Sequence, residues 1–220
     1  MNTSTLIALC LAASALTGGV AQAKVIAINT PAQPLTMERI GTLPDDQQAP
    51  WRAYLLRSQL QMEVDRQSLP AELAPGQTPP APPVAAGGGA GTMPLDRPAR
   101  WYRSAEARAI ADTIVSFQTP AGGWSKNQDR MGAPRLPGQR FANDAETMVQ
   151  DPANFDAPND RFWTFVGTLD NDATTNEMRF LQRIAAALPG DEGEPYRHSF
   201  VRGVEYLLAA QYPNGGWPQN

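Results

Sequence analysis

The sequence predicts an all-α fold in which helices pair around a ring, with a further helix and a Pro/Gly-rich linker before them. Two observations favour this class. Apolar residues recur at three- and four-residue spacing in several segments. A Gly-Gly-Trp loop occurs twice, at Gln118–Asn127 and Gln211–Asn220, each time after such a segment, and six of the ten positions are identical. A repeated helix-to-loop unit indicates a helical repeat architecture, with the helices arranged pairwise in a ring.

The first 23 residues have the pattern of a signal peptide. An apolar segment over Leu6–Thr17 is followed by Ala21-Gln22-Ala23, a small-residue cleavage pattern, although no Lys or Arg precedes Lys24. The apolar segment is too short to cross a bilayer, so we expect no membrane span and a secreted or periplasmic protein. Cleavage would also remove Cys10, the single cysteine, which excludes disulfides and thiolate metal sites.

Residues 24–69 are expected to form an N-terminal helical segment. Prolines make residues 24–47 irregular in this reading, and a helix follows whose apolar face includes Trp51, Tyr54 and Leu55. Residues 70–99 are rich in Pro, Ala and Gly, a composition that cannot bury enough side chain to offset the entropy of ordering. We therefore expect a flexible, disordered linker there.

Three further helices are predicted after the linker. The first covers Trp101–Phe117, with Ser104 as its N-cap. The second begins near Thr174, which has the capping-box spacing with Glu177, and carries a stripe made of Met178, Leu181, Ile184, Ala185 and Leu188. The third precedes Gln211. Residues 128–166 are expected to be irregular, except for a buried extended segment over 161–166.

The charge balance narrows the classes of partner. The formal net charge is −4, which argues against a nucleic-acid partner. His198, the single histidine, cannot build a zinc site without cysteines or another histidine, and we expect it at the surface.

Residues Asp170-Asn171-Asp172-Ala173-Thr174-Thr175, taken with the two Gly-Gly-Trp loops, resemble the family 10 pectate lyases. The resemblance covers residues 100–220 and implies part of an α/α-toroid catalytic domain that cleaves polygalacturonate by β-elimination. It implies calcium as cofactor, with Asp170 as a catalytic residue and metal ligand, and Asn171 as a ligand of metal or substrate. Without it, Asp170, Asn171 and Asp172 would be read as helix-entry capping residues.

The first loop supplies the other candidate residues. Lys126 matches the family's Gly-Gly-Trp-x-Lys-Asn element and would pair with a uronate carboxylate, whereas the second loop has Gln219 in that position. Trp124 and Trp217 have two readings. Either their rings stack on sugars as substrate-binding residues, or they are packing wedges that fix the repeat.

The resemblance also bears on completeness. In that family the domain continues past the second loop, and its catalytic arginine matches no position here, so we expect it downstream of Asn220. The chain is then a fragment that is inactive alone, with uncovered apolar helix faces that favour association, and the complete enzyme is a monomer. The alternative function is a non-catalytic α/α-toroid carbohydrate-binding module.

Overall fold

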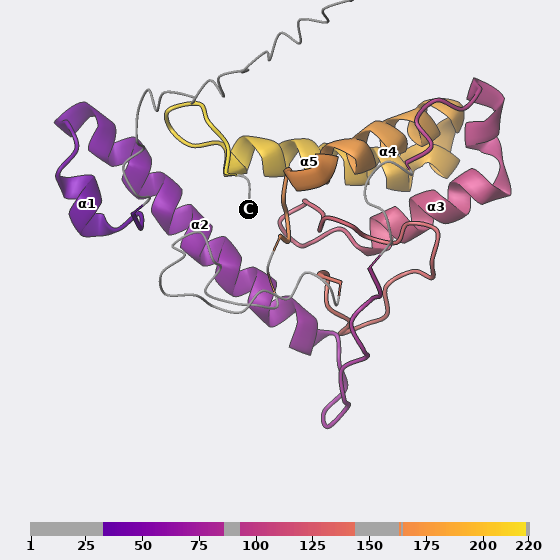
Figure 1. Ribbon diagram of the computed structural model, residues 1–220, viewed down its shortest axis with the longest axis horizontal. Coiled ribbons are helices and arrows are strands. Elements are labelled where there is room, and N and C mark those ends of the chain that lie inside the picture. The colour runs from indigo at the N-terminus through magenta and orange to yellow at the C-terminus, as the bar shows by residue number, and fades with distance from the viewer. Residues whose placement is uncertain (1–32, 86–92, 144–162, 164, 219–220) are drawn as a thin grey trace, which may run out of the picture. The chain divides into compact units, whose positions relative to one another are not determined.

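The described part of the chain is helical, without strands or a sheet. The computed structural model describes residues 33–85, 93–143, 163 and 165–218, and all statements on structure refer to these residues. The α-helices are α1 (Met37–Gly41), α2 (Asp45–Ala71), α3 (Ala105–Ser116), α4 (Thr175–Ala187) and α5 (Glu194–Ala210), as Figure 1 shows. Three 3₁₀ segments lie at Ala99–Arg103, Asp170–Asp172 and Gly190–Gly193. The all-α prediction is confirmed, and the ring stays a prediction.

Some predictions fall outside the described residues. These are the signal peptide over residues 1–23, the middle of the predicted linker at 86–92, and the irregular stretch from 144 to 162. The described residues belong to one compact unit. None of the described helices has the length and apolar character needed to cross a membrane.

The core lies between α3, α4 and α5. Helix α4 contacts both of the others, and the short segment Gly190–Gly193 joins it to α5, so the two helices lie side by side (Figure 1). The apolar spacing of the sequence explains the burial, because one face of each helix points inward. The fully buried large side chains of this core are Ile114, Trp124, Phe180, Leu181 and Ile184.

Helix α3 begins at Ala105, four residues later than predicted. Ser104 has an extended backbone, and its hydroxyl accepts a hydrogen bond from the backbone N–H of Ala107 at 3.2 Å, so the predicted N-cap is confirmed. The residues before it belong to the 3₁₀ segment Ala99–Arg103. The extended conformation that an N-cap requires thus separates the two helical segments.

The first Gly-Gly-Trp loop is held by four hydrogen bonds. The side-chain amide of Gln118 donates to the Gly122 carbonyl at 2.8 Å, the Gly122 N–H donates to the Thr119 carbonyl at 2.9 Å, and the Thr119 N–H donates to the Gly123 carbonyl at 3.0 Å. The indole N–H of Trp124 then reaches back to the Ile114 carbonyl in α3 at 2.8 Å. Gly122 has a φ of 105°, which a residue with a Cβ adopts at a steric cost.

The second loop repeats all four bonds at positions 93 residues later. The bonds are Gln211 to Gly215 at 2.9 Å, Gly215 to Tyr212 at 2.8 Å, Tyr212 to Gly216 at 2.8 Å, and Trp217 to Leu207 at 2.8 Å. The sequence repeat is therefore also a structural repeat, with the same loop attached to the ends of α3 and α5.

Helix α2 packs on the second loop through aromatic rings. The ring centroids of Trp51 and Tyr54 lie 5.7 and 5.3 Å from that of Tyr212. The predicted irregular stretch 24–47 is wrong in part, since α1 covers Met37–Gly41 and α2 begins at Asp45. The prolines permit this because Pro44 sits just before α2, where an unpaired backbone nitrogen carries no penalty.

The predicted linker is not flexible throughout. Helix α2 continues to Ala71, and the Glu72 carboxylate then binds the Arg135 guanidinium at 2.5 Å and the Gly138 N–H at 2.6 Å. Further along, Met93 is part of the buried core, and the Pro94 carbonyl accepts the hydroxyl of Tyr102 at 3.0 Å. Specific partners elsewhere in the chain thus order the described parts of a segment whose composition alone suggested disorder.

Candidate substrate and cation site

The first Gly-Gly-Trp loop and the polar loop before α4 lie against each other. The Trp124 carbonyl accepts the N–H groups of Gly167 and Thr168, each at 3.1 Å, and the Lys126 N–H donates to the Phe165 carbonyl at 3.3 Å. On the other side of this contact, the Tyr206 hydroxyl of α5 donates to the Gly167 carbonyl. Burial raises the pKa of Tyr206 above its ordinary 10.0, so this donor keeps its proton at neutral pH.

Lys126 and Asp170 form the centre of the site. The Lys126 ammonium lies 2.7 Å from Asp170 Oδ2 and 3.3 Å from the centre of the Phe165 ring. The two charged side chains are 13% and 22% exposed, so the pair is largely buried but still reaches solvent. The aromatic face and the carboxylate together hold a cation in place.

Two asparagines flank this pair. The Asn171 side-chain amide donates to Asn127 Oδ1 at 3.1 Å. The buried Asn143 donates to the carbonyls of Lys126 and Asn127 at 2.9 and 3.3 Å, which fixes the backbone that carries the lysine. The sequence prediction brought Lys126, Asp170 and Asn171 forward as site residues, and the structure places all three together.

Backbone strain is concentrated in these two loops. In the described chain, the non-glycine residues with positive φ are Asn127, Phe165, Asn171, Asp172 and Thr174, with φ between 50° and 63°. For a β-branched residue such as Thr174 this conformation is a marked outlier. Strain of this kind costs about 1–3 kcal/mol per residue and clusters at functional sites, which supports a functional reading of the two loops.

The predicted capping box at α4 is wrong. Thr174 occupies the N-cap position without a capping bond. Its hydroxyl instead accepts from the Trp124 N–H at 3.1 Å and donates to the Trp124 carbonyl at 3.4 Å, so a tertiary contact replaces the local one. Glu177 likewise turns away from the helix end and binds Arg130, whose Nε donates to Glu177 Oε1 at 2.6 Å.

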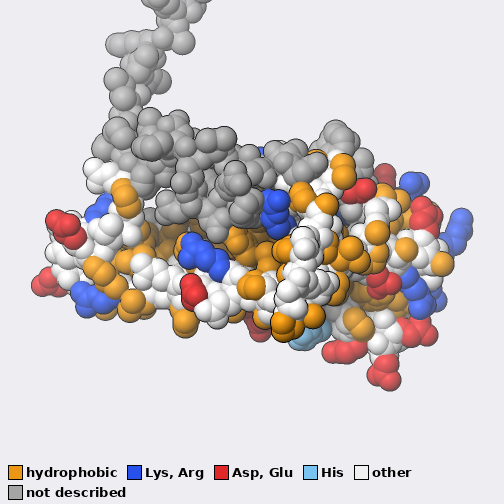
Figure 2. Space-filling model, turned by 90° about the horizontal axis from the view of Figure 1, so that it is seen from below, with side chains coloured by type: hydrophobic (Ala, Val, Ile, Leu, Met, Phe, Trp, Pro, Cys, Tyr) orange, Lys and Arg blue, Asp and Glu red, His pale blue; other side chains and the backbone are white. Residues whose placement is uncertain are grey.

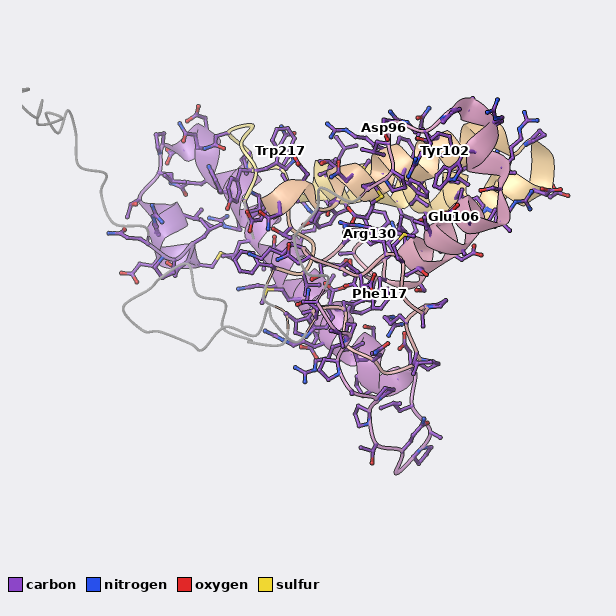
Figure 3. The ribbon with its side chains drawn as sticks, turned by 45° about the vertical axis from the view of Figure 1, so that its right-hand side comes forward. Asp96, Tyr102, Glu106, Phe117, Arg130 and Trp217 are labelled. Atoms are coloured by element: carbon purple, nitrogen blue, oxygen red, sulfur yellow. The ribbon has the colours of Figure 1, made fainter. Side chains whose placement is uncertain are left out.

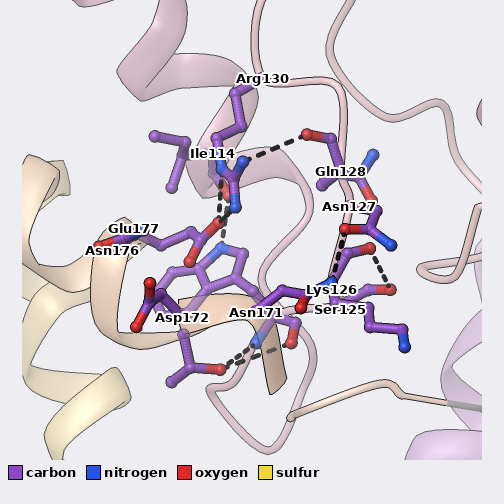
Figure 4. A network of polar contacts seen from close by, with 12 residues as sticks. Ile114, Ser125, Lys126, Asn127, Gln128, Arg130, Asn171, Asp172, Asn176 and Glu177 are labelled. Carbon is purple, nitrogen blue, oxygen red and sulfur yellow. Dashed lines mark hydrogen bonds and ion pairs between the residues drawn. The ribbon is translucent and has the colours of Figure 1, made fainter. Parts of the chain in front are cut away.

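The Arg130–Glu177 pair is buried below the loops. Figure 4 shows the two side chains pointing toward each other, and they are 5% and 1% exposed. Nearby, both polar atoms of the buried Gln128 side chain have no hydrogen-bond partner among the described residues. No pattern in the sequence predicts this pair, because its members lie 47 positions apart, one in a stretch expected to be irregular and the other in an expected helix cap.

The two tryptophans have different environments. Trp124 is 1% exposed and is covered by α4 and α5, which agrees with the packing reading, since a buried ring offers no face to a sugar. Trp217 is 45% exposed (labelled in Figure 3), so of the two it is the one able to stack on a ligand. Of the predicted extended segment 161–166, the described residues are not extended: Trp163 has 3₁₀ conformation, and Phe165 and Val166 lie in a turn, with Phe165 at a φ of 50°.

His198 and Arg179 are two further exposed side chains on the core helices. His198 is at the surface as expected, and its pale blue colour is visible in Figure 2 among charged and apolar side chains. Arg179 donates to the Asn176 side-chain oxygen at 3.3 Å, while the neighbouring Glu177 is paired with Arg130.

The described donor set of the site fits a hard cation that takes further oxygens from a ligand or from water. Asp170 supplies a carboxylate, and Asn171 and Asn127 supply amide oxygens, which are ligands that calcium prefers. The described residues contain no group of three acidic, histidine or cysteine side chains that could hold a metal by themselves. Beside these described residues, a calcium ion at Asp170 would take further oxygens from a ligand or from water, and it would compete with the Lys126 ammonium.

Comparison with known proteins gives one family match. Residues 118–220 match the family model described as pectic acid lyase. The match covers both Gly-Gly-Trp loops and the polar loop, and it supports a pectate lyase-type family for this segment, with pectate as the substrate that the family implies. It begins at Gln118, so residues 100–117 of the expected domain lie outside it. A comparison with curated proteins finds no match.

Proposed function

We propose that this chain belongs to a secreted, calcium-dependent pectate lyase of the family 10 type, and that the Lys126–Asp170 site binds the uronate next to the scissile bond. The observation that carries the proposal is the Lys126–Asp170 contact of 2.7 Å at the junction of two strained loops, inside the segment that matches pectic acid lyases. The residues near it are those that a polyanionic sugar and a hard cation both require.

The chemistry follows from the reaction class. β-Elimination removes the C5 proton of a galacturonate and expels the oxygen at C4, so charge develops toward the neighbouring carboxylate. Calcium held by Asp170 and Asn171 would neutralise that carboxylate and make the C5 proton more acidic. Lys126, once it is displaced from Asp170, binds a substrate carboxylate as a point charge.

The remaining residues of the site position these groups. Asn143 fixes the backbone at Lys126, and Thr174 fixes the backbone at Trp124. The lysine and the aspartate therefore lie on two loops that are hydrogen-bonded to each other. Phe165 covers one side of the ammonium and limits its access to water. Asp170 is the residue whose loss should matter most, because both cations of the mechanism bind its carboxylate.

The test is incubation of polygalacturonate with the whole chain and calcium, followed by the ultraviolet absorbance of unsaturated products and, separately, by retention on immobilised polygalacturonate. Because the arginine that the resemblance implies as base matches no position of this chain, we expect it to give calcium-dependent retention without absorbance, and a chelator and Asp170→Asn both to abolish the retention. Retention that neither the chelator nor Asp170→Asn changes would favour the non-catalytic binding module. If the chain is not retained and gives no absorbance, both functions are overturned.

A further inference from the structure

A second basic feature lies at the other end of α4. A pocket of about 650 Å³ opens where the 3₁₀ segment Ala99–Arg103 contacts α4. Four arginines line it: Arg97, Arg100, Arg103 and Arg183. No Asp or Glu is among its lining residues in the part of the chain that the structure describes. Four of the 18 basic residues of a chain with net charge −4 are thus gathered around one opening.

The arginines of this pocket are available to a ligand. Arg97, Arg100 and Arg103 are exposed, and within the described residues no ion pair involves any of the four. Arg97 lies 5.7 Å from the centre of the Trp101 ring, and Arg183 donates one hydrogen bond to the Arg179 carbonyl at 3.2 Å. Their positive charge is therefore not neutralised by a neighbouring carboxylate.

The chemistry of this pocket suits a chain of carboxylates. A guanidinium binds a carboxylate through two parallel N–H bonds, which makes arginine the side chain of choice for planar acid groups. The walls between the arginines are Tyr102 and the small residues Ala99, Ala186 and Ala187, which leave room for a bulky sugar ring. Several separated cations favour a ligand that carries several separated acids.

The pocket is separate from the proposed catalytic site. Arg183 lies eight residues beyond Thr175, the first residue of α4, which is roughly 12 Å along the helix axis from the end next to Asp170. A ligand in the pocket therefore does not need to touch Lys126.

We infer that this four-arginine pocket is a second binding site for polygalacturonate, which holds the polymer by its carboxylates while another part of it reaches the Lys126–Asp170 site. The identity of the polymer rests on the proposed function. The pocket itself rests on the arginines, their lack of carboxylate partners among the described residues, and their place at the far end of α4.

The experiment compares two double variants of the whole chain in binding to polygalacturonate, by calorimetry at low salt. Arg100→Gln/Arg103→Gln removes two charges at the pocket, and Arg52→Gln/Arg66→Gln removes two exposed charges from α2. We expect the first to weaken binding about fivefold and the second to leave it unchanged, with equal melting temperatures. Fully methyl-esterified pectin lacks the charged carboxylates, so we expect it to bind the parent and both variants equally.

Each other outcome overturns the inference. Equal weakening by both double variants would mean that only net charge matters, and no weakening by the first would mean that the pocket is not a site. If the pocket variant loses heparin or RNA binding to the same extent as polygalacturonate binding, the pocket is a general polyanion surface. If the parent does not bind polygalacturonate at all, the proposed function fails as well, which distinguishes the two failures.

Discussion

The buried pair of Arg130 and Glu177 is the residue-level feature with the largest expected effect on stability. Glu177→Gln would leave the Arg130 guanidinium buried without its counter-charge, since both side chains are almost inaccessible. Breaking a buried pair in this way costs about 3 kcal/mol. We therefore expect a loss of that size in the free energy of unfolding, measured by urea denaturation.

A matched control for this variant is Glu192→Gln, which breaks the exposed pair with Arg108 on the same molecule. Surface pairs contribute less than about 1 kcal/mol, because solvent screens them. If the two substitutions lower the free energy of unfolding equally, burial does not increase the contribution of the Arg130–Glu177 pair.

Lys126 supplies a second prediction at this scale. Its ammonium is paired with the Asp170 carboxylate that the proposed calcium ion needs. Removing the charge while keeping the side-chain length should therefore raise the affinity for calcium. We expect Lys126→Met to bind calcium about tenfold more tightly than the parent chain in calorimetry without substrate, a gain of about 1.4 kcal/mol.

Lys126→Arg keeps a cation at the same place and is the control, with calcium affinity expected near that of the parent chain. Calcium that binds the methionine and arginine variants equally would show that the lysine does not compete for the metal.

At the level of elements, α5 depends on a glycine where it crosses the first loop. A Cβ at Gly203 would lie 2.9 Å from Met178 Cγ and 3.1 Å from Trp124 Cζ3, both in the packed core. Gly203→Ala should therefore destabilise the chain by about 1–3 kcal/mol, as overpacking does. Thermal unfolding measures this, with Gly41→Ala as control because no atom lies within 4 Å of a Cβ at Gly41.

The connection between α2 and the loop at 135–139 predicts a pH effect. Burial raises the pKa of Glu72, but hydrogen bonds from Arg135 and Gly138 and the charge of Arg135 outweigh it, so the pKa lies below its ordinary 4.5. The stability from this carboxylate is present above pH 4.5 and is lost as the pH falls through the folded-state pKa.

Glu72→Gln should accordingly lower stability by about 1 kcal/mol at pH 7, and the difference from the parent chain should vanish in acid. Melting temperatures of both proteins across pH 3–7 measure it. A difference that stays constant down to the lowest pH would contradict the role of the Glu72 charge.

Helix positions followed from the sequence where the information is local. The apolar spacing of Met178, Leu181 and Ile184 and the Ser104 cap identified α3 and α4 because both patterns act within a few residues. Thr174 was misread because its partner is the Trp124 backbone, 50 positions away. The order around Glu72 was missed for the same reason, since its partner is Arg135.

The candidate site divides in the same way. Lys126, Asp170 and Asn171 were predicted because they lie in the long motifs on which the family resemblance rests. The Phe165 ring below the ammonium and the Asn143 support have no such motif, and only the folded contact between two loops reveals them.

At the scale of the whole molecule, several large apolar side chains remain uncovered. Leu60 on α2 and Leu208 on α5 are 68% and 66% exposed, besides Trp217 at the second loop. We expect the chain to associate as its concentration rises, and Leu60→Gln/Leu208→Gln to reduce this without lowering the melting temperature. Analytical ultracentrifugation measures the association and thermal unfolding measures the melting temperature. A constant mass of 23.8 kDa at all concentrations would contradict the expectation.

The two Gly-Gly-Trp loops share one hydrogen-bond framework, but only the first carries a lysine after its tryptophan. In evolutionary terms, a duplicated unit lets one copy keep the architecture while the other is free to change its chemistry. The two units share the four bonds that close the loop, and the position two residues after the tryptophan is one of the four positions that differ between them. Enzymes assembled from copies of this unit can therefore acquire new specificities by single substitutions at that position, without remaking the scaffold.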